Sequence, residues 1–174
     1  MSSTKKTNAP KQPSGAGERT LPAIGAKAPN FRLEADDGET YALRDLKGER
    51  FVLYFYPRDS TPGCTVEACD FRDRRDAFAA ADTRIFGVSG DSIASHQRFR
   101  DKQALTFPLL SDPGNEVARA YGAYGQKNMY GKIREGIIRS TFVVGADGRI
   151  EAVYSPVKVK GHADAVLTAL GAGG

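Results

Sequence analysis

Residues 51–69 read Phe-Val-Leu-Tyr-Phe-Tyr-Pro-Arg-Asp-Ser-Thr-Pro-Gly-Cys-Thr-Val-Glu-Ala-Cys. The apolar and aromatic run at 51–56 predicts a central β-strand that is covered on both faces. Thr61 is a favourable helix N-cap, and Pro62 suits the first helical position. This stretch therefore predicts a strand-to-helix junction, with Cys64 in the first turn of the helix.

Cys64 and Cys69 are the only two cysteines of the chain. The reactive form of a cysteine is the thiolate, and the free backbone N–H groups and positive dipole end of a first helical turn favour an anion. We therefore interpret Cys64 as a nucleophile. Buried cysteines often serve as small apolar core residues, and for Cys69 this alternative stays open.

The segments on either side of this junction predict alternating strands and helices. Residues 31–35 and 39–43 alternate in polarity around an Asp-Asp-Gly turn, which is typical of a β-hairpin. Downstream we expect a helix of about fifteen residues, strands at 83–89 and 107–110, helices at 92–104, 114–121 and 163–170, and a second hairpin of 137–144 with 149–154. The pattern indicates an α/β protein of thioredoxin-like fold, with a mixed central β-sheet flanked by helices and an N-terminal β-hairpin extension.

Composition predicts one domain at residues 21–174. The chain has 174 residues, of which 40% are apolar and 26% charged. Residues 1–20 contain almost no large apolar side chains, so we expect a disordered basic tail there. Most of the net charge of +4 lies in this tail, so the charge does not indicate a nucleic-acid-binding face on the domain.

The sequence contains no apolar run long enough for a membrane span and no secretory signal, so we expect a cytoplasmic protein. Two cysteines and two histidines at these spacings match no zinc pattern, and we expect no metal. His96 and His162 are expected at the surface without a role. Residues 122–132 mix Gly, Lys and aromatic side chains, which indicates a mobile surface loop more strongly than nucleic-acid stacking.

The stretch around Cys64 resembles the peroxiredoxins, specifically the bacterioferritin comigratory protein or peroxiredoxin Q subfamily. The family motif is Pro, three residues, Thr or Ser, two residues and then the peroxide-reacting Cys, with a distant Arg. These positions fall on Pro57, Thr61, Cys64 and Arg139, and a second cysteine follows at Cys69. The resemblance runs from about residue 25 to the carboxyl terminus.

The resemblance implies a thiol peroxidase that reduces hydrogen peroxide and organic hydroperoxides without a cofactor. Cys64 would become a sulfenic acid, and Cys69 would react with it to form an intrachain disulfide. Thioredoxin would then reduce this disulfide. The subfamily also implies a monomer. Arg139 would stabilise charge on the departing oxygen, Thr61 would orient the peroxide, and Pro57 would exclude water.

The rate gain available from ionising the Cys64 thiol is small, which indicates that other groups must contribute to catalysis. A cysteine of ordinary pKa, near 8.5, is about 3 per cent thiolate at pH 7, so full ionisation gains only about thirtyfold. We therefore expect Arg139 and Thr61 to act chiefly on the transition state. The alternative for Arg139 is an outward-facing strand position shared with Thr141.

The spacing of the two cysteines requires a conformational change. Five residues along a helix separate two Cα atoms by roughly 8.6 Å, whereas a disulfide needs about 7 Å or less. We therefore expect the first turns of the helix to unwind on oxidation, helped by Gly63. Two other functions stay open: a thiol-disulfide oxidoreductase of the same fold without peroxidase activity, and a binding protein that acts through its basic tail.

Overall fold

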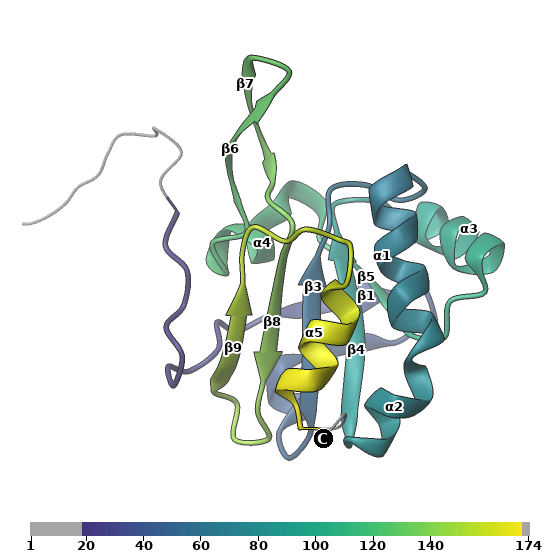
Figure 1. Cartoon of the computed structure of the whole chain (residues 1–174), viewed down its shortest axis with the longest axis vertical. Helices are drawn as coiled ribbons and strands as arrows, with labels where there is room; N and C mark the ends of the chain where they lie inside the picture. Colours follow the sequence, from purple (N-terminus) through teal and green to yellow (C-terminus); the bar gives the residue numbers. More distant parts are fainter. Residues whose placement is uncertain (1–18, 172–174) are drawn as a thin grey trace, which may run out of the picture.

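The structure of the protein, a computed structural model, describes residues 19–171, and a mixed seven-stranded sheet forms its centre (Figure 1). The strand order is β2-β1-β5-β4-β3-β8-β9. This arrangement confirms the expected mixed sheet and thioredoxin-like fold. The strands of this sheet are β1 (Arg32–Ala35), β2 (Thr40–Ala42), β3 (Arg50–Phe55), β4 (Thr83–Ser89), β5 (Leu109–Ser111), β8 (Ser140–Val144) and β9 (Ile150–Tyr154).

Helices cover both faces of the sheet. One face packs against α1 (Pro62–Asp73), α2 (Arg75–Ala80), α3 (Ile93–Gln103) and α5 (His162–Ala169). The other packs against the 3-10 helix η2 (Leu43–Leu46) and α4 (Glu116–Ala120), which follows a second 3-10 turn, η3 (Pro113–Asn115). Residues 51–55 of β3 point alternately into the two cores, which explains the continuous apolar and aromatic run there.

The register of β3 positions the residues that follow it. This strand is parallel to β4 on one side and antiparallel to β8 on the other. Phe55, its last residue, lies opposite Ser140, the first residue of β8. Because the two strands run in opposite directions, the chain entering β8 lies beside the chain leaving β3. Arg139 is therefore brought to the start of the junction that carries Cys64, although the two are 75 residues apart.

Three expected elements differ in the structure. The expected helix of about fifteen residues before the strand at 83–89 is divided at Arg74 into α1, which contains both cysteines, and α2. The expected loop at 122–132 instead contains most of a two-stranded hairpin, β6 (Tyr124–Met129) and β7 (Lys132–Ile137), which projects from the domain in Figure 1. Both faces of this hairpin are largely exposed, so its sequence lacks the alternation that identifies a strand. The strand expected from residue 137 accordingly begins at Ser140.

The segment that leads into the domain makes defined contacts. Residues 1–18 of the expected tail lie outside the described residues. Arg19 donates from Nη1 to the carbonyl oxygen of Gly122 (2.9 Å) and to the Ser155 hydroxyl (2.6 Å). The expected tail boundary at residue 20 thus falls within a segment that contacts the domain, and the division at 20/21 stays a prediction. None of the helices within residues 19–171 is both long and apolar enough to cross a membrane.

Candidate functional site

Cys64 occupies the first turn of α1, and its side chain is 1% exposed. Thr61 has the extended backbone of an N-cap (φ −84°, ψ 156°), and Pro62 is at the first helical position, as predicted. The Thr61 hydroxyl, however, donates to the carbonyl oxygen of Arg58 (2.9 Å) and makes no capping bond to the helix. The helix therefore begins at Pro62 without a side-chain cap from Thr61.

Arg139 approaches the sulfur directly. Its Nη1 lies 3.5 Å from Cys64 Sγ and 2.6 Å from Glu67 Oε1. Its side chain is only 17% exposed, and a Cβ atom at Gly63 would lie 3.2 Å from Arg139 Nη2, so the glycine leaves room for the guanidinium. The structure thus places Arg139 in the site and not on an outward-facing strand, and Thr141 is fully buried.

Glu67 is a site residue that the sequence analysis missed. It lies three residues after Cys64, so both share one face of α1, and it is 1% exposed. Burial raises the pKa of Glu67 to about 7, and the neighbouring Arg139 offsets only part of that effect. Its second oxygen, Oε2, has no hydrogen-bond partner in the part of the chain that the structure describes. The carboxyl group therefore holds Arg139 in place while sharing its positive charge with the sulfur.

Cys69 lies farther along α1 and is half-buried, with its Sγ 3.6 Å from Gln103 Oε1 of α3. Both cysteines are free thiols, and α1 is continuous between them. Helix geometry separates their Cα atoms by roughly 8.6 Å, which is too far for a disulfide. The structure thus has the geometry of a reduced protein.

The loop between β3 and α1 is anchored by a buried ion pair. Asp59 Oδ2 lies 2.7 Å from His96 Nδ1, and its Oδ1 accepts from the Tyr56 hydroxyl (2.6 Å). The other imidazole nitrogen of His96, Nε2, lies 2.9 Å from the carbonyl oxygen of Leu110. Because both nitrogens face acceptors, His96 needs both of its protons, and the pair is an imidazolium with a carboxylate. This anchor fixes the segment that carries Pro57 and Thr61.

The expectation that His96 lies at the surface is wrong, because its side chain is fully buried on α3. Burial alone would lower the pKa of His96, but the contact with Asp59 outweighs it, and the pKa is raised from 6.5. The pKa of Asp59 is correspondingly lowered, since its bonds to His96 and Tyr56 outweigh its burial. The sequence around His96 is that of a polar helix and does not indicate burial, because the burial depends on Asp59, which lies 37 residues upstream.

His162 is also buried, contrary to expectation. Its Nε2 lies 2.8 Å from Thr141 Oγ1, and its ring makes T-shaped contacts with the rings of Phe71 and Tyr154. Burial and the positive charge of Arg139 lower the pKa of His162 to about 4, so it is neutral at pH 7. At pH 7, His96 is therefore a cation within its ion pair, whereas His162 is neutral.

Asp59, Asp91 and His96 lie close enough together to share a cation. Asp59 Oδ2 already contacts Ser95 and His96, however, and Asp91 Oδ2 already accepts from the Asp59 backbone and the Ser89 hydroxyl. These atoms are therefore engaged in anchoring the loop.

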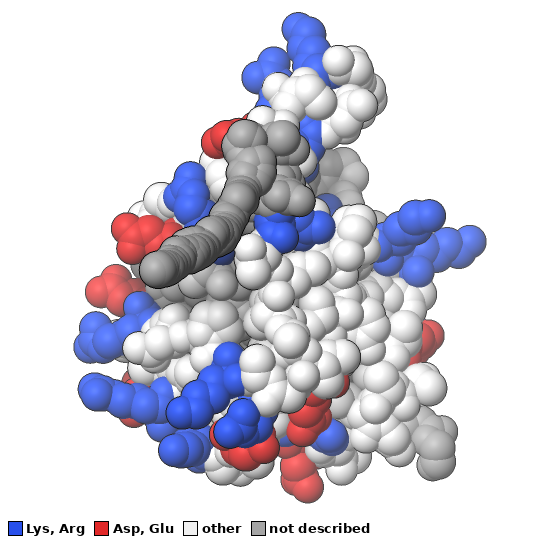
Figure 2. Space-filling model, turned by 90° about the vertical axis from the view of Figure 1, so that its left-hand side faces the viewer, with Lys and Arg blue, Asp and Glu red and all other residues white. Residues whose placement is uncertain are grey.

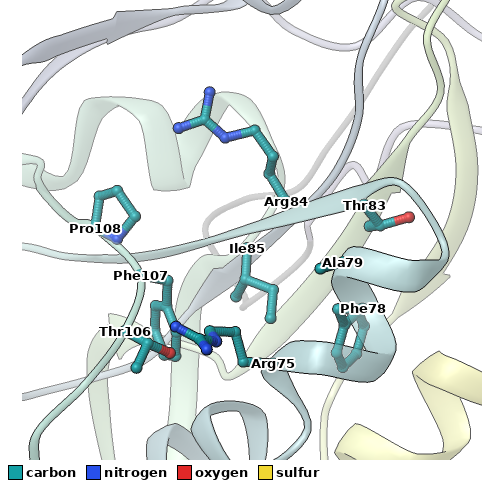
Figure 3. Close-up of a pocket in the computed structure, with 9 residues that line it drawn as sticks. All are labelled: Arg75, Phe78, Ala79, Thr83, Arg84, Ile85, Thr106, Phe107 and Pro108. Atoms are coloured by element: carbon teal, nitrogen blue, oxygen red, sulfur yellow. The ribbon is translucent and has the colours of Figure 1, made fainter.

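Two cavities lie at opposite ends of the sheet. One of about 570 Å³ is lined by Pro57 and Arg139, together with residues of β6. Another, of about 220 Å³, lies between α2, the start of β4 and residues 106–108 (Figure 3). Because β3 and β4 are parallel, the start of β4 is at the opposite end of the sheet from Pro57. Only the first cavity adjoins the cysteine site.

The chain is similar to several known proteins. The profile of the AhpC/TSA family matches residues 24–153. A putative peroxiredoxin of Mycobacterium tuberculosis is 53% identical over 79% of this chain and 88% of its own length, and peroxiredoxin Bcp of Bacillus subtilis is 48% identical over 84% and 94%. The solved structure of Xanthomonas campestris bacterioferritin comigratory protein, studied for alkyl peroxide reduction, matches with a TM-score of 0.79 at 43% identity, over 90% and 99% of the two chains.

The two histidines provide a direct check on the buried charges. At pH 6 we expect histidine-selective ¹⁵N NMR to show His96 with both nitrogens protonated and His162 as a neutral tautomer, because the pKa of His96 is raised and that of His162 is about 4. The chain has two histidines in all, so each resonance can be assigned by substituting the other. A neutral His96 at this pH would contradict the buried ion pair.

Replacing Glu67 with Gln removes a buried titrating group and keeps an oxygen beside Arg139. The folded pKa of about 7 exceeds the ordinary 4.5, so the protonated form favours folding, and this contribution is lost as pH rises from 4.5 through 7. The difference corresponds to about 3 kcal/mol. We expect urea unfolding to show wild-type stability falling by about this amount, relative to Glu67→Gln, between pH 4 and pH 8.

The matched control is Glu39→Gln, which removes a carboxyl group at an exposed position. If the difference between wild type and Glu67→Gln varied with pH no more than the difference for this control, the carboxyl group of Glu67 would not be held neutral by its burial.

Proposed function

The chain belongs to the AhpC/TSA family, in the Bcp/peroxiredoxin Q group of peroxiredoxins, and we propose that it reduces hydrogen peroxide and organic hydroperoxides through Cys64. One observation carries this proposal: the guanidinium of Arg139 lies 3.5 Å from a sulfur in the first turn of a helix. The arrangement supplies a nucleophile and a fixed cation at the same point.

In the first step, the Cys64 thiolate attacks one peroxide oxygen and the O–O bond breaks. The sulfur is oxidised to a sulfenic acid, and the departing alkoxide or hydroxide takes up a proton to leave as an alcohol or water. Arg139 offsets the negative charge that moves onto the departing oxygen, which is the transition-state role of a preorganised donor. Thr61 would orient the peroxide through its hydroxyl, and Pro57 would restrict water at the sulfur.

In the second step, the Cys69 thiol attacks the sulfenic sulfur, water leaves, and an intrachain disulfide forms. The two sulfurs can meet only if the amino-terminal part of α1 unwinds. Gly63 lowers the cost of that change, and the Asp59 anchor retains the preceding loop. A dithiol reductant, in our proposal thioredoxin, then reduces the disulfide by exchange.

The intrachain pair also supports a monomeric enzyme, because no second subunit is needed to supply the resolving thiol. We place the enzyme in the cytoplasm, where a reducing environment returns the disulfide to two thiols. Its role there is antioxidant defence and redox homeostasis.

Intact-mass measurement of the full chain tests the roles of both cysteines. One equivalent of hydrogen peroxide added to the reduced protein should remove two hydrogens from the wild type. It should add one oxygen to Cys69→Ser, because the sulfenic acid has no partner thiol, and should leave Cys64→Ser unchanged.

The converse result, oxidation of Cys64→Ser at the wild-type rate, would contradict the assignment of the nucleophile. If neither cysteine reacts with peroxide while the protein still exchanges disulfides with a thioredoxin system, the chain would be an oxidoreductase without peroxidase activity.

A further inference from the structure

The cavity beside the cysteine site is much larger than hydrogen peroxide needs. Its volume is about 570 Å³, which is within the usual range for sites that bind small organic molecules. Pro57, Ile138 and Pro156 supply apolar surface, and Arg139 connects the cavity to Cys64. The cavity is therefore large enough for the organic body of a hydroperoxide, and Arg139 lies between this body and the sulfur.

Two further cations, Arg19 and Lys127, line the same cavity. Within residues 19–171, neither makes a salt bridge, and the hydrogen-bond acceptors of Arg19 are the uncharged Gly122 and Ser155. Figure 2 shows further basic side chains on the projecting hairpin. The wall of the cavity thus carries positive charge that the described part of the chain does not neutralise.

Two glycines of the hairpin leave room for the side chains of these cations. Gly125 of β6 lies directly opposite Gly136 of β7, so both positions face the same side of the hairpin. A Cβ at Gly125 would lie 3.1 Å from Arg19 Cγ, and one at Gly136 would lie 3.6 Å from Lys127 Cδ. The long stems of the two cations therefore lie over a surface without side chains, at the base of the hairpin.

The electrostatics of Lys127 also connect it to the reaction centre. Burial and the nearby charge of Arg139 lower its pKa, while the charge of Cys64 raises it. A positive group in this position is stabilised by an anion in the cavity. Arg139 itself is already paired with Glu67, so Lys127 and Arg19 are the cations of the cavity lining that have no acidic partner among residues 19–171.

We infer that this cavity binds the carboxylate of an organic hydroperoxide, and that Lys127 is the residue that makes the enzyme prefer an acidic hydroperoxide over its neutral ester. This inference rests on the proposed peroxidase function and adds a substrate class to it. The apolar surface contacts the organic body, Lys127 and Arg19 face the carboxylate, and Arg139 faces the peroxide group.

The test compares one short hydroperoxide as its free carboxylate and as its methyl ester. Stopped-flow measurement of oxidation at Cys64 in the reduced full chain should give the acid a second-order rate constant about two- to fivefold higher, as expected for one half-exposed ion pair. The ratio of the two rate constants should decline with added salt, because the cavity is open to solvent.

Variants identify the residue responsible. The ratio of acid to ester should fall toward one in Lys127→Gln and should be largely retained in Lys127→Arg, which keeps the charge. Lys132→Gln is the matched control, since Lys132 is an exposed cation of β7 outside the cavity lining. Its ratio should equal that of the wild type.

Equal rate constants for acid and ester, or a ratio that Lys127→Gln leaves unchanged, would overturn the inference while leaving the peroxidase function intact. Failure of both compounds and of hydrogen peroxide to oxidise Cys64 would overturn the peroxidase function as well.

Discussion

One guanidinium contacts both a sulfur and a carboxyl group, and the chemistry that we propose for this protein depends on that contact. Arg139 reaches Cys64 and Glu67 from the same nitrogen, so its charge is divided between the nucleophile and a buried acid. The antiparallel pairing of β3 with β8 brings the two chain segments together, and Gly63 leaves the space. A side chain at Gly63 or a shift in strand register would displace the cation from the sulfur.

The surroundings of the site combine a fixed part with a part that must move. Asp59 is held by Tyr56, Ser95 and His96, so the loop before the helix is bound to α3 and, through His96, to β5. In the proposed mechanism, the first turns of α1, in contrast, open before Cys64 meets Cys69. Anchoring the loop would limit that opening to the helix itself and would keep Pro57 and Thr61 in place.

Sequence reasoning recovered the elements whose signals are local. The strand at 51–56, the start of the helix at Pro62 and both hairpins of the main sheet follow from apolar runs, capping residues and turn residues, and the structure contains all of them. The position of Arg139 beside Cys64 came from the family resemblance, because no local rule relates residues 75 positions apart.

The buried ionisable groups could not be predicted in the same way. His96 and Glu67 lie in helical stretches of mixed polarity, and their burial depends on partners from other elements or on the packing of α1 against the sheet. Glu67 alone left a usable signal, since its spacing of three from Cys64 places both on one helical face. The β6–β7 hairpin was missed because strands exposed on both faces carry no alternation.

The rate of Cys64 oxidation per thiolate, in wild type and in Arg139→Ala, tests the central claim most directly. Stopped-flow oxidation by hydrogen peroxide over a range of pH, with thiolate followed by its ultraviolet absorbance, separates ionisation from reactivity. A transition-state role for Arg139 predicts a rate per thiolate about 10² lower in the variant, as found when a preorganised donor is removed. An unchanged rate per thiolate, with only the thiolate fraction reduced, would contradict it.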